Sequence, residues 1–323
     1  MFTNDQLRVI DNVEAAYDQW LSVARRFDEH ADRLQWKSVK GREYLYRIKD
    51  GAGNGESLGP RTAELEAFAQ SYKAQRDQAK TTLSSLRTRL DELARQYRAL
   101  RLPRIDDAAA RVLAMADRAG RLGADLIVVG TNAMVAYEIE AQDRFATGLD
   151  ATEDCDFTWA GDTQTAFSTG TGGLLALLKR VDKTYTINTK KPHQVRNAQA
   201  YAVDFLTSEA GIADYPKDEP VRALPLPGQE WLVLGEPVSH VVTSRRGLVA
   251  QITAPDPRYF ALHKVWLSER PDREATKASK DLQQAQVLWR AVQQLMKRYP
   301  VDAAFIGGLP AELRRGASGL ASA

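Results

Sequence analysis

The stretch ADLIVVGTNAMVAYEIE, residues 124–140, decides the fold of the central part of the chain. Its first seven residues form an apolar run that ends in Gly130, which predicts a short buried strand, and residues 131–140 predict a helix. A glycine between a strand and a helix allows a close backbone approach, and the helix start offers free N–H groups to a phosphate. Thr131 adds a hydroxyl group at this turn.

Two later segments place aspartates among apolar residues. Asp154 and Asp156 lie at the start of a strand predicted over residues 155–161. Asp204 lies inside YAVDFL, within a strand predicted over residues 199–207. Because residues i and i+2 of a strand point to the same face, Asp154 and Asp156 are expected side by side, and an adjacent strand can bring Asp204 next to them.

Three crowded carboxylates predict a cation site. They repel one another, and their ionised forms are costly unless cations lie between them. Mg²⁺ is the expected ion, with Mn²⁺ as its substitute, because Mg²⁺ prefers oxygen ligands and binds through a few carboxylates together with substrate phosphates. Two such ions can activate an attacking hydroxyl and stabilise a leaving pyrophosphate. An ordinary acidic turn is the alternative explanation for an isolated Asp-x-Asp pair.

Strands and helices alternate after Pro103, and helices dominate the C-terminal part. A helix begins after Asp106, the expected N-cap. This order predicts a mixed sheet layer with a helical cap. The tail, residues 314–323, is expected to be frayed. Strands are further predicted at 183–189, 231–234, 238–243 and 248–253, and helices at 172–182, 258–269 and 273–299.

The N-terminal part has a different pattern. Residues 4–34 predict an amphipathic helix that ends near Trp36, and residues 37–60 a basic hairpin or strand with a glycine-rich tip. Residues 61–101 contain no glycine or proline and repeat apolar residues three and four apart, which predicts a long helix with one packing seam. Its partner is either the first helix or a second copy of the chain, which would make a homodimer.

The pattern as a whole predicts an α+β protein in three parts. Residues 1–105 are expected to form long N-terminal helices with the basic hairpin inserted, in a coiled-coil-like arrangement. Residues 106–256 are expected to form a small mixed-sheet catalytic domain, and residues 257–323 a C-terminal helical domain.

Composition excludes several classes of protein. The 323 residues are 44% hydrophobic and 27% charged, a mixture that can bury a core, so general disorder is excluded. The single cysteine permits no internal disulfide, and the four histidines have no metal-ligand spacing. No apolar run is long enough to cross a membrane and no signal segment is visible, so we expect a cytoplasmic protein without a membrane partner.

The glycine turn followed by the three aspartates resembles the nucleotidyltransferase superfamily, which includes DNA polymerase β, the minimal nucleotidyltransferases and the AbiEii-type toxins. The resemblance covers about residues 120–290, and YLYR at 44–47 and SLGPR at 57–61 are similar to segments of bacterial nucleotidyltransferase-fold proteins. Thr131, where Gly or Ser is usual, and the long segment between Gly130 and Asp154 depart from the superfamily pattern.

The resemblance implies a role for each matching residue. The aspartates would be catalytic and hold two metal ions, the glycine motif would hold the triphosphate, and Lys264 would contact phosphate. Lys280 and Asp281 would complete the nucleotide site. The implied set is Asp154, Asp156 and Asp204 for the metals, and Gly130, Thr131, Asn132, Lys264, Lys280 and Asp281 for the nucleotide.

The expected activity is Mg²⁺-dependent transfer of a nucleoside monophosphate from an NTP, for example ATP, to an acceptor hydroxyl, with release of pyrophosphate. The acceptor stays open among RNA, including tRNA, a protein side chain and a small molecule. The alternative is a non-catalytic nucleic-acid-binding or regulatory protein that uses the basic segments 37–49 and 87–104. A toxin role is implied only by the AbiEii-type resemblance.

Overall fold

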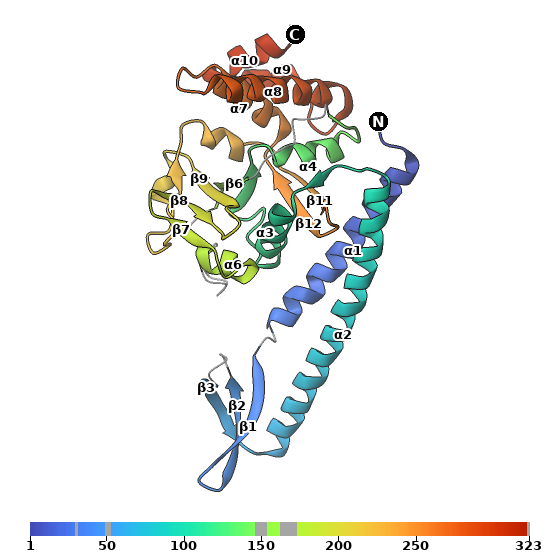
Figure 1. The fold of residues 1–323 in the computed structure, drawn as a ribbon, viewed down its shortest axis with the longest axis vertical. Coiled ribbons are helices and arrows are strands. Elements are labelled where there is room, and N and C mark those ends of the chain that lie inside the picture. The colour runs from blue at the N-terminus through green and yellow to red at the C-terminus, as the bar shows by residue number, and fades with distance from the viewer. Residues whose placement is uncertain (30–31, 49–52, 146–153, 162–172, 322–323) are drawn as a thin grey trace. The chain divides into compact units, whose positions relative to one another are not determined.

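The computed structural model describes residues 1–29, 32–48, 53–145, 154–161 and 173–321 (Figure 1). The chain forms two compact units. Unit 1 consists of residues 1–14 and 93–323, and unit 2 of residues 15–92. Helices α1 (Asn4–Glu29) and α2 (Ala63–Ala99) each begin in one unit and end in the other.

Unit 2 contains a small antiparallel sheet, which lies between α1 and α2 in the sequence. Its strands are β1 (Arg33–Val39), β2 (Arg42–Ile48) and β3 (Gly55–Pro60), in the order β1-β2-β3. Leu45 and Ile48 of β2 are buried. The helix predicted to reach Leu34 ends earlier, because the period-2 alternation of RLQWKSV favours a strand and Trp36 pairs with Leu45 across the sheet. That part of the prediction was wrong.

The long second helix is confirmed as α2. The residues on its expected seam are the less exposed ones, and burial is complete near its C-terminal end at Leu90, Leu93 and Tyr97. The helix ends before Pro103, which cannot continue it.

Unit 1 is built on two sheets. The larger has the strand order β5-β6-β9-β8-β7, with β10 paired to β9, and the smaller the order β12-β11-β4. The strands of the larger sheet are β5 (Leu126–Val129), β6 (Asp154–Trp159), β7 (Thr186–Asn188), β8 (Lys191–Arg196), β9 (Ala202–Thr207) and β10 (Leu224–Pro225). Those of the smaller sheet are β4 (Arg104–Ile105), β11 (Val238–Ser244) and β12 (Val249–Ala254).

Two predictions about strands in this unit were wrong. Strand β8, which begins KPHQ, was not predicted, because its sequence is polar and contains a proline; it forms by pairing with β7 and β9. The strand predicted at 231–234 is instead part of the 3₁₀ helix η2 (Gln229–Val233), which follows Gly228 at φ +85°. The left-handed glycine turns the chain before a strand can begin.

Helices cover the sheets. Helix α3 packs against β12 and α6, and α4 packs against β11 and β12. The Asp106 side chain accepts a hydrogen bond from the backbone N–H of Ala108 and caps α3, as predicted. The helices of unit 1 are α3 (Asp107–Arg118), α4 (Ala133–Glu140), α6 (Leu174–Val181), α7 (Pro257–Ser268), α8 (Ala275–Leu295), α9 (Ala303–Gly308) and α10 (Ala311–Ala321).

Residues 314–321 of the C-terminal tail belong to a helix, so the prediction of a frayed end was wrong for them; residues 322–323 lie outside the described residues. Helix α10 packs on α7 and buries Leu313, Ala317 and Leu320. Gly316 lies so close to α7 that an added Cβ would be 3.3 Å from Cγ1 of Val265. Position at the chain end suggested fraying, but Gly316 permits a close helix contact.

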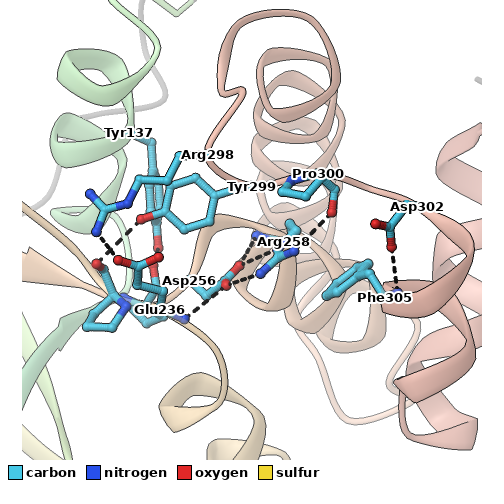
Figure 2. A network of polar contacts seen from close by, with 11 residues as sticks. Tyr137, Glu236, Asp256, Arg258, Arg298, Tyr299, Pro300, Asp302 and Phe305 are labelled. Atoms are coloured by element: carbon cyan, nitrogen blue, oxygen red, sulfur yellow. Dashed lines mark hydrogen bonds and ion pairs between the residues drawn. The ribbon is translucent and has the colours of Figure 1, made fainter.

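A polar network attaches the C-terminal helices to the sheet layer (Figure 2). Asp256, which is 1% exposed, caps α7 and accepts hydrogen bonds from the Arg258 guanidinium at 2.7 and 3.0 Å. Arg258 also donates to the Pro300 carbonyl at 2.9 Å and lies over the Phe305 ring. At one end Asp256 also accepts a hydrogen bond from the backbone N–H of Glu236, and at the other Arg258 reaches Pro300, so the network holds the start of α7 against the segment before β11.

The elements together confirm the predicted α+β class, with N-terminal helices, a mixed-sheet core and C-terminal helices. In the described part of the chain, none of the helices is both long and apolar enough to cross a membrane.

Candidate active site

The aspartates lie on two neighbouring parallel strands. Strand β6 pairs with β9 so that Asp156 is directly opposite Asp204, and Asp154 is opposite Ala202. Neighbouring strands lie about 4.8 Å apart and paired residues point to the same face. Asp154, Asp156 and Asp204 therefore project from one face of the sheet; the two-residue spacing predicted this for the first two, and the adjacent strand brings in Asp204 as expected.

The glycine turn is packed against this acidic face. Strand β5 pairs with β6, with Val129 opposite Asp156, and Gly130 follows in the left-handed region at φ +70°. A Cβ added at Gly130 would collide with Oδ2 of Asp156 and lie 3.3 Å from its Cγ. The position thus requires glycine for two independent reasons, backbone conformation and contact with a carboxylate.

The electrostatics of Asp156 reflect this crowding. Burial, followed by the negative charges of Asp154 and Asp204, raises the pKa of the Asp156 carboxyl to about 7, while Lys264 and Arg273 act in the opposite direction. Such a carboxylate is stabilised by any added positive charge. The same three carboxylates also raise the pKa of the buried Cys155 thiol, whose largest cause is burial. Cys155 is therefore held as a neutral thiol.

The donor set fits a hard divalent cation. Oδ1 of Asp204 is buried and has no hydrogen-bond partner among the described residues, which is costly unless a ligand satisfies it. In their present rotamers, the described His, Cys, Asp and Glu side chains form no group of three or more close enough to hold a metal ion. Since the backbone already brings Asp156 and Asp204 to paired positions, rotation about their side-chain bonds is the change that a shared ion requires.

A buried ion cluster lies on the helices beside the acidic face. Nζ of Lys264 on α7 donates to Oδ1 of Asp281 on α8 at 2.6 Å, and Arg273 binds the other oxygen, Oδ2, at 2.6 and 2.8 Å. Lys264 and Asp281 are 5% and 2% exposed. Burial lowers the pKa of the Lys264 ammonium, while Asp281 and Asp156 raise it. We call Lys264, Asp281 and Arg273 the basic cluster; its formal charge is +1.

The basic cluster changes the role expected of Asp281. Both carboxylate oxygens of Asp281 are bonded to cations, so this residue holds Lys264 and Arg273 in position. Arg273 was not predicted, because it lies in the polar segment before α8, where no periodic pattern marks it. The only sequence signal is its position eight residues before Asp281. Lys280 lies next to Asp281 on α8 and is partly exposed.

The remaining predicted residues lie at the start of α4. Asn132 is 4% exposed, and its side-chain amide donates to the Asp154 carbonyl at 2.8 Å, which ties the glycine turn to the first residue of β6. The Thr131 hydroxyl lies 3.5 Å from Nε2 of Gln284 on α8. Gly130, Thr131 and Asn132 thus lie between the acidic face and α8. Residues 146–153 of the long segment before Asp154 lie outside the described residues.

The site thus combines carboxylates on paired strands with a strand–glycine–helix turn and a buried lysine. A family model described as Nucleotidyltransferase matches residues 107–306, more than half of the chain. The chain therefore belongs to this nucleotidyltransferase family, as the resemblance indicated. Neither a curated protein nor a solved structure matches it. The matched range includes the acidic face and the basic cluster, and it excludes unit 2.

Proposed function

We propose that the protein is a Mg²⁺-dependent enzyme that transfers a nucleoside monophosphate from an NTP to an acceptor hydroxyl and releases pyrophosphate. Asp154, Asp156 and Asp204 would hold the metal, which when bound would neutralise charge at the phosphates and help activate the attacking hydroxyl. The observation that carries the proposal is the pairing of Asp156 with Asp204 on adjacent strands, directly against Gly130.

The chain's own residues supply the other parts of the reaction. The backbone at Gly130 and the start of α4 offer N–H groups to the triphosphate. Lys264 and Arg273, held by Asp281, supply positive charge against the phosphate oxygens. Asp204, whose Oδ1 has no partner among the described residues, is the carboxylate available to take the proton of the acceptor hydroxyl. The new bond joins the acceptor oxygen to the α-phosphorus, and the bond from that phosphorus to pyrophosphate breaks.

The test incubates the full chain with each α-labelled NTP, Mg²⁺ and a cell extract, and asks whether label enters RNA, protein or small molecules. Wild type is compared with Asp156→Asn, and Asp218→Asn is the matched control because Asp218 is an exposed aspartate outside the site. We expect Asp156→Asn to abolish labelling and the control to retain it. Labelling that survives Asp156→Asn, or that needs no divalent cation, would contradict the proposal.

Fold integrity is measured alongside. Asp156→Asn removes one of three repelling negative charges, so without Mg²⁺ its thermal midpoint should equal or exceed that of wild type. A variant that is inactive because it is unfolded would show a lower midpoint and is thereby distinguished from one that has lost a metal ligand.

A further inference from the structure

Unit 2 contains a pocket of about 570 Å³, between the end of α1, the strands β1 and β2, and the first half of α2. All of its lining residues lie between Phe27 and Lys80, so the pocket belongs to unit 2 alone. Its volume is that of a small-ligand site. The family match begins at residue 107, so the pocket lies outside the matched range.

The wall of the pocket is positively charged. Its basic residues are Arg33, Arg61, Lys73, Arg76 and Lys80, against the two acidic residues Glu66 and Asp77. Glu66 is already bonded by Arg61, which also binds Glu43. The excess of positive charge is therefore available to an anion in the pocket.

Both lysines that line the pocket have no partner among the described residues. Lys73 and Lys80 are one heptad apart on α2, so they lie on the same face of the helix, and both are exposed. Neither makes a hydrogen bond or ion pair in the part of the chain that the structure describes. They lie about 10 Å apart along the helix axis at 1.5 Å per residue. Two phosphates of one flexible strand, separated by a further nucleotide, can span that distance.

The same pocket presents aromatic rings. Trp36 and Phe27 are half-buried, with the guanidinium of Arg61 5.3 Å from the Trp36 ring centre and that of Arg76 5.8 Å from the Phe27 ring centre. Tyr72 is fixed by a hydrogen bond from its hydroxyl to the Asp32 carbonyl at 3.0 Å. Planar rings and guanidinium groups held in place next to free cations form a surface on which flat, charged ligands can stack.

From this combination we propose that the pocket binds single-stranded nucleic acid. The lysines bind the phosphates and the rings of Trp36 and Phe27 stack against unpaired bases. A duplex has its bases stacked internally and cannot offer them to a concave pocket, and an acidic peptide would use the cations but not the rings. Binding of single-stranded nucleic acid by the pocket does not depend on the proposed function. That the bound RNA is the acceptor of the transfer reaction does rest on the proposed function.

The test measures fluorescence anisotropy of a labelled 20-nucleotide oligouridylate RNA with the full chain, without NTP, at several salt concentrations. Lys73→Glu/Lys80→Glu should weaken binding at least about tenfold and lower the salt slope by about 1.4, since each phosphate contact on a single strand contributes about 0.7. The matched control is Lys183→Glu/Lys190→Glu, which changes the charge equally at exposed lysines of unit 1 and should change affinity less than about twofold.

A second pair of variants tests stacking. Trp36→Ala should weaken binding by about fivefold to 150-fold, whereas Trp36→Phe should retain most of it, because stacking on an aromatic ring is tolerant of the ring type. The idea is overturned if the two lysine pairs behave alike, if a duplex of equal length binds as tightly, or if poly-glutamate displaces the RNA at equal charge concentration. Absence of binding by wild type at 50 mM salt would also overturn it.

The active-site variant separates this inference from the proposed function. Asp156→Asn should bind the RNA as tightly as wild type, because Asp156 lies in unit 1 and not in the pocket. Loss of labelling with unchanged RNA binding supports both proposals. Unchanged labelling of Asp156→Asn together with pocket-dependent RNA binding would remove the proposed function and leave the pocket.

Discussion

The Cα of Gly130 faces the carboxylate of Asp156 so closely that a Cβ at this position would overlap Oδ2. The two residues are 26 positions apart in the chain and meet because β5 and β6 are antiparallel neighbours. A turn that offers backbone N–H groups therefore lies directly beside a carboxylate with a raised pKa. Under the proposed function, the groups that would bind phosphate and metal meet at this one point of the sheet, as a metal-bound nucleotide requires.

Gly130→Ala should therefore abolish nucleotidyl transfer. The added methyl group displaces the Asp156 carboxylate, and the left-handed backbone at φ +70° adds a strain of roughly 1–2 kcal/mol. Transfer activity and the free energy of unfolding are the two measurements.

Gly123→Ala is the matched control. Gly123 is also left-handed, at φ +79°, but its nearest neighbour, Oγ1 of Thr253, lies 3.6 Å from an added Cβ. Both variants should lose similar stability, and only Gly130→Ala should lose activity. Equal activities would show that contact with Asp156 has no bearing on the reaction.

Asp281→Asn should destabilise the protein strongly. It leaves the Lys264 ammonium buried with a neutral partner, and breaking a buried ion pair costs about 3–5 kcal/mol. Chemical denaturation should show this loss, while Asp272→Asn, at an exposed ion pair with Arg270, should leave the stability unchanged. If the cost comes from the stranded charge, adding Lys264→Met to Asp281→Asn should restore part of the stability; a further loss would contradict that explanation.

Strand periodicity was sufficient to place Asp154 and Asp156 on one face of a strand. Asp154, Asp156 and Asp204 each lie in a short apolar segment, and the side-chain alternation of a strand leaves few ways to arrange them. The parallel pairing of β6 with β9, which places Asp156 opposite Asp204, is a long-range choice that local pattern does not contain. Arg273 could not be predicted for the same reason, because its role depends on where Asp281 lies in space.

Local pattern failed where tertiary contacts decide the structure. Leu34 and Trp36 continue the apolar period of the first helix, yet they belong to β1, because pairing with β2 satisfies their backbone groups. The polar strand β8 likewise exists through its neighbours β7 and β9. In both cases pairing outweighs intrinsic propensity.

Stability should fall with acid in a way that depends on His263. The imidazole is 3% exposed between Trp231 and Trp266, and burial, followed by the charge of Lys264, lowers its pKa from 6.5 to about 3. The unfolded chain then binds a proton that the folded chain does not, so the contribution to stability is complete above pH 6.5 and is lost as the pH falls toward 3.

His263→Phe removes this term and keeps the aromatic contact. Between pH 6.5 and 4.5 the wild type should lose on the order of 1 kcal/mol per pH unit more than the variant, measured by urea denaturation at each pH. His193→Gln, at a partly exposed histidine on β8, should follow the wild-type curve. Parallel curves for wild type and His263→Phe would mean that the imidazole is not buried as a neutral group.

Leu313 offers a direct test of the C-terminal helix. If α10 were detached from α7, Leu313→Ala would be tolerated; because the packed helix fully buries this side chain, the substitution should cost about 2–5 kcal/mol. Arg315→Ala, two residues away on the exposed face of the same helix, should change the stability by no more than about 0.5 kcal/mol. Because α10 packs on α7, which carries Lys264, the Leu313 variant should lose transfer activity at a temperature at which the wild type stays folded and active, whereas with a detached helix it would keep it.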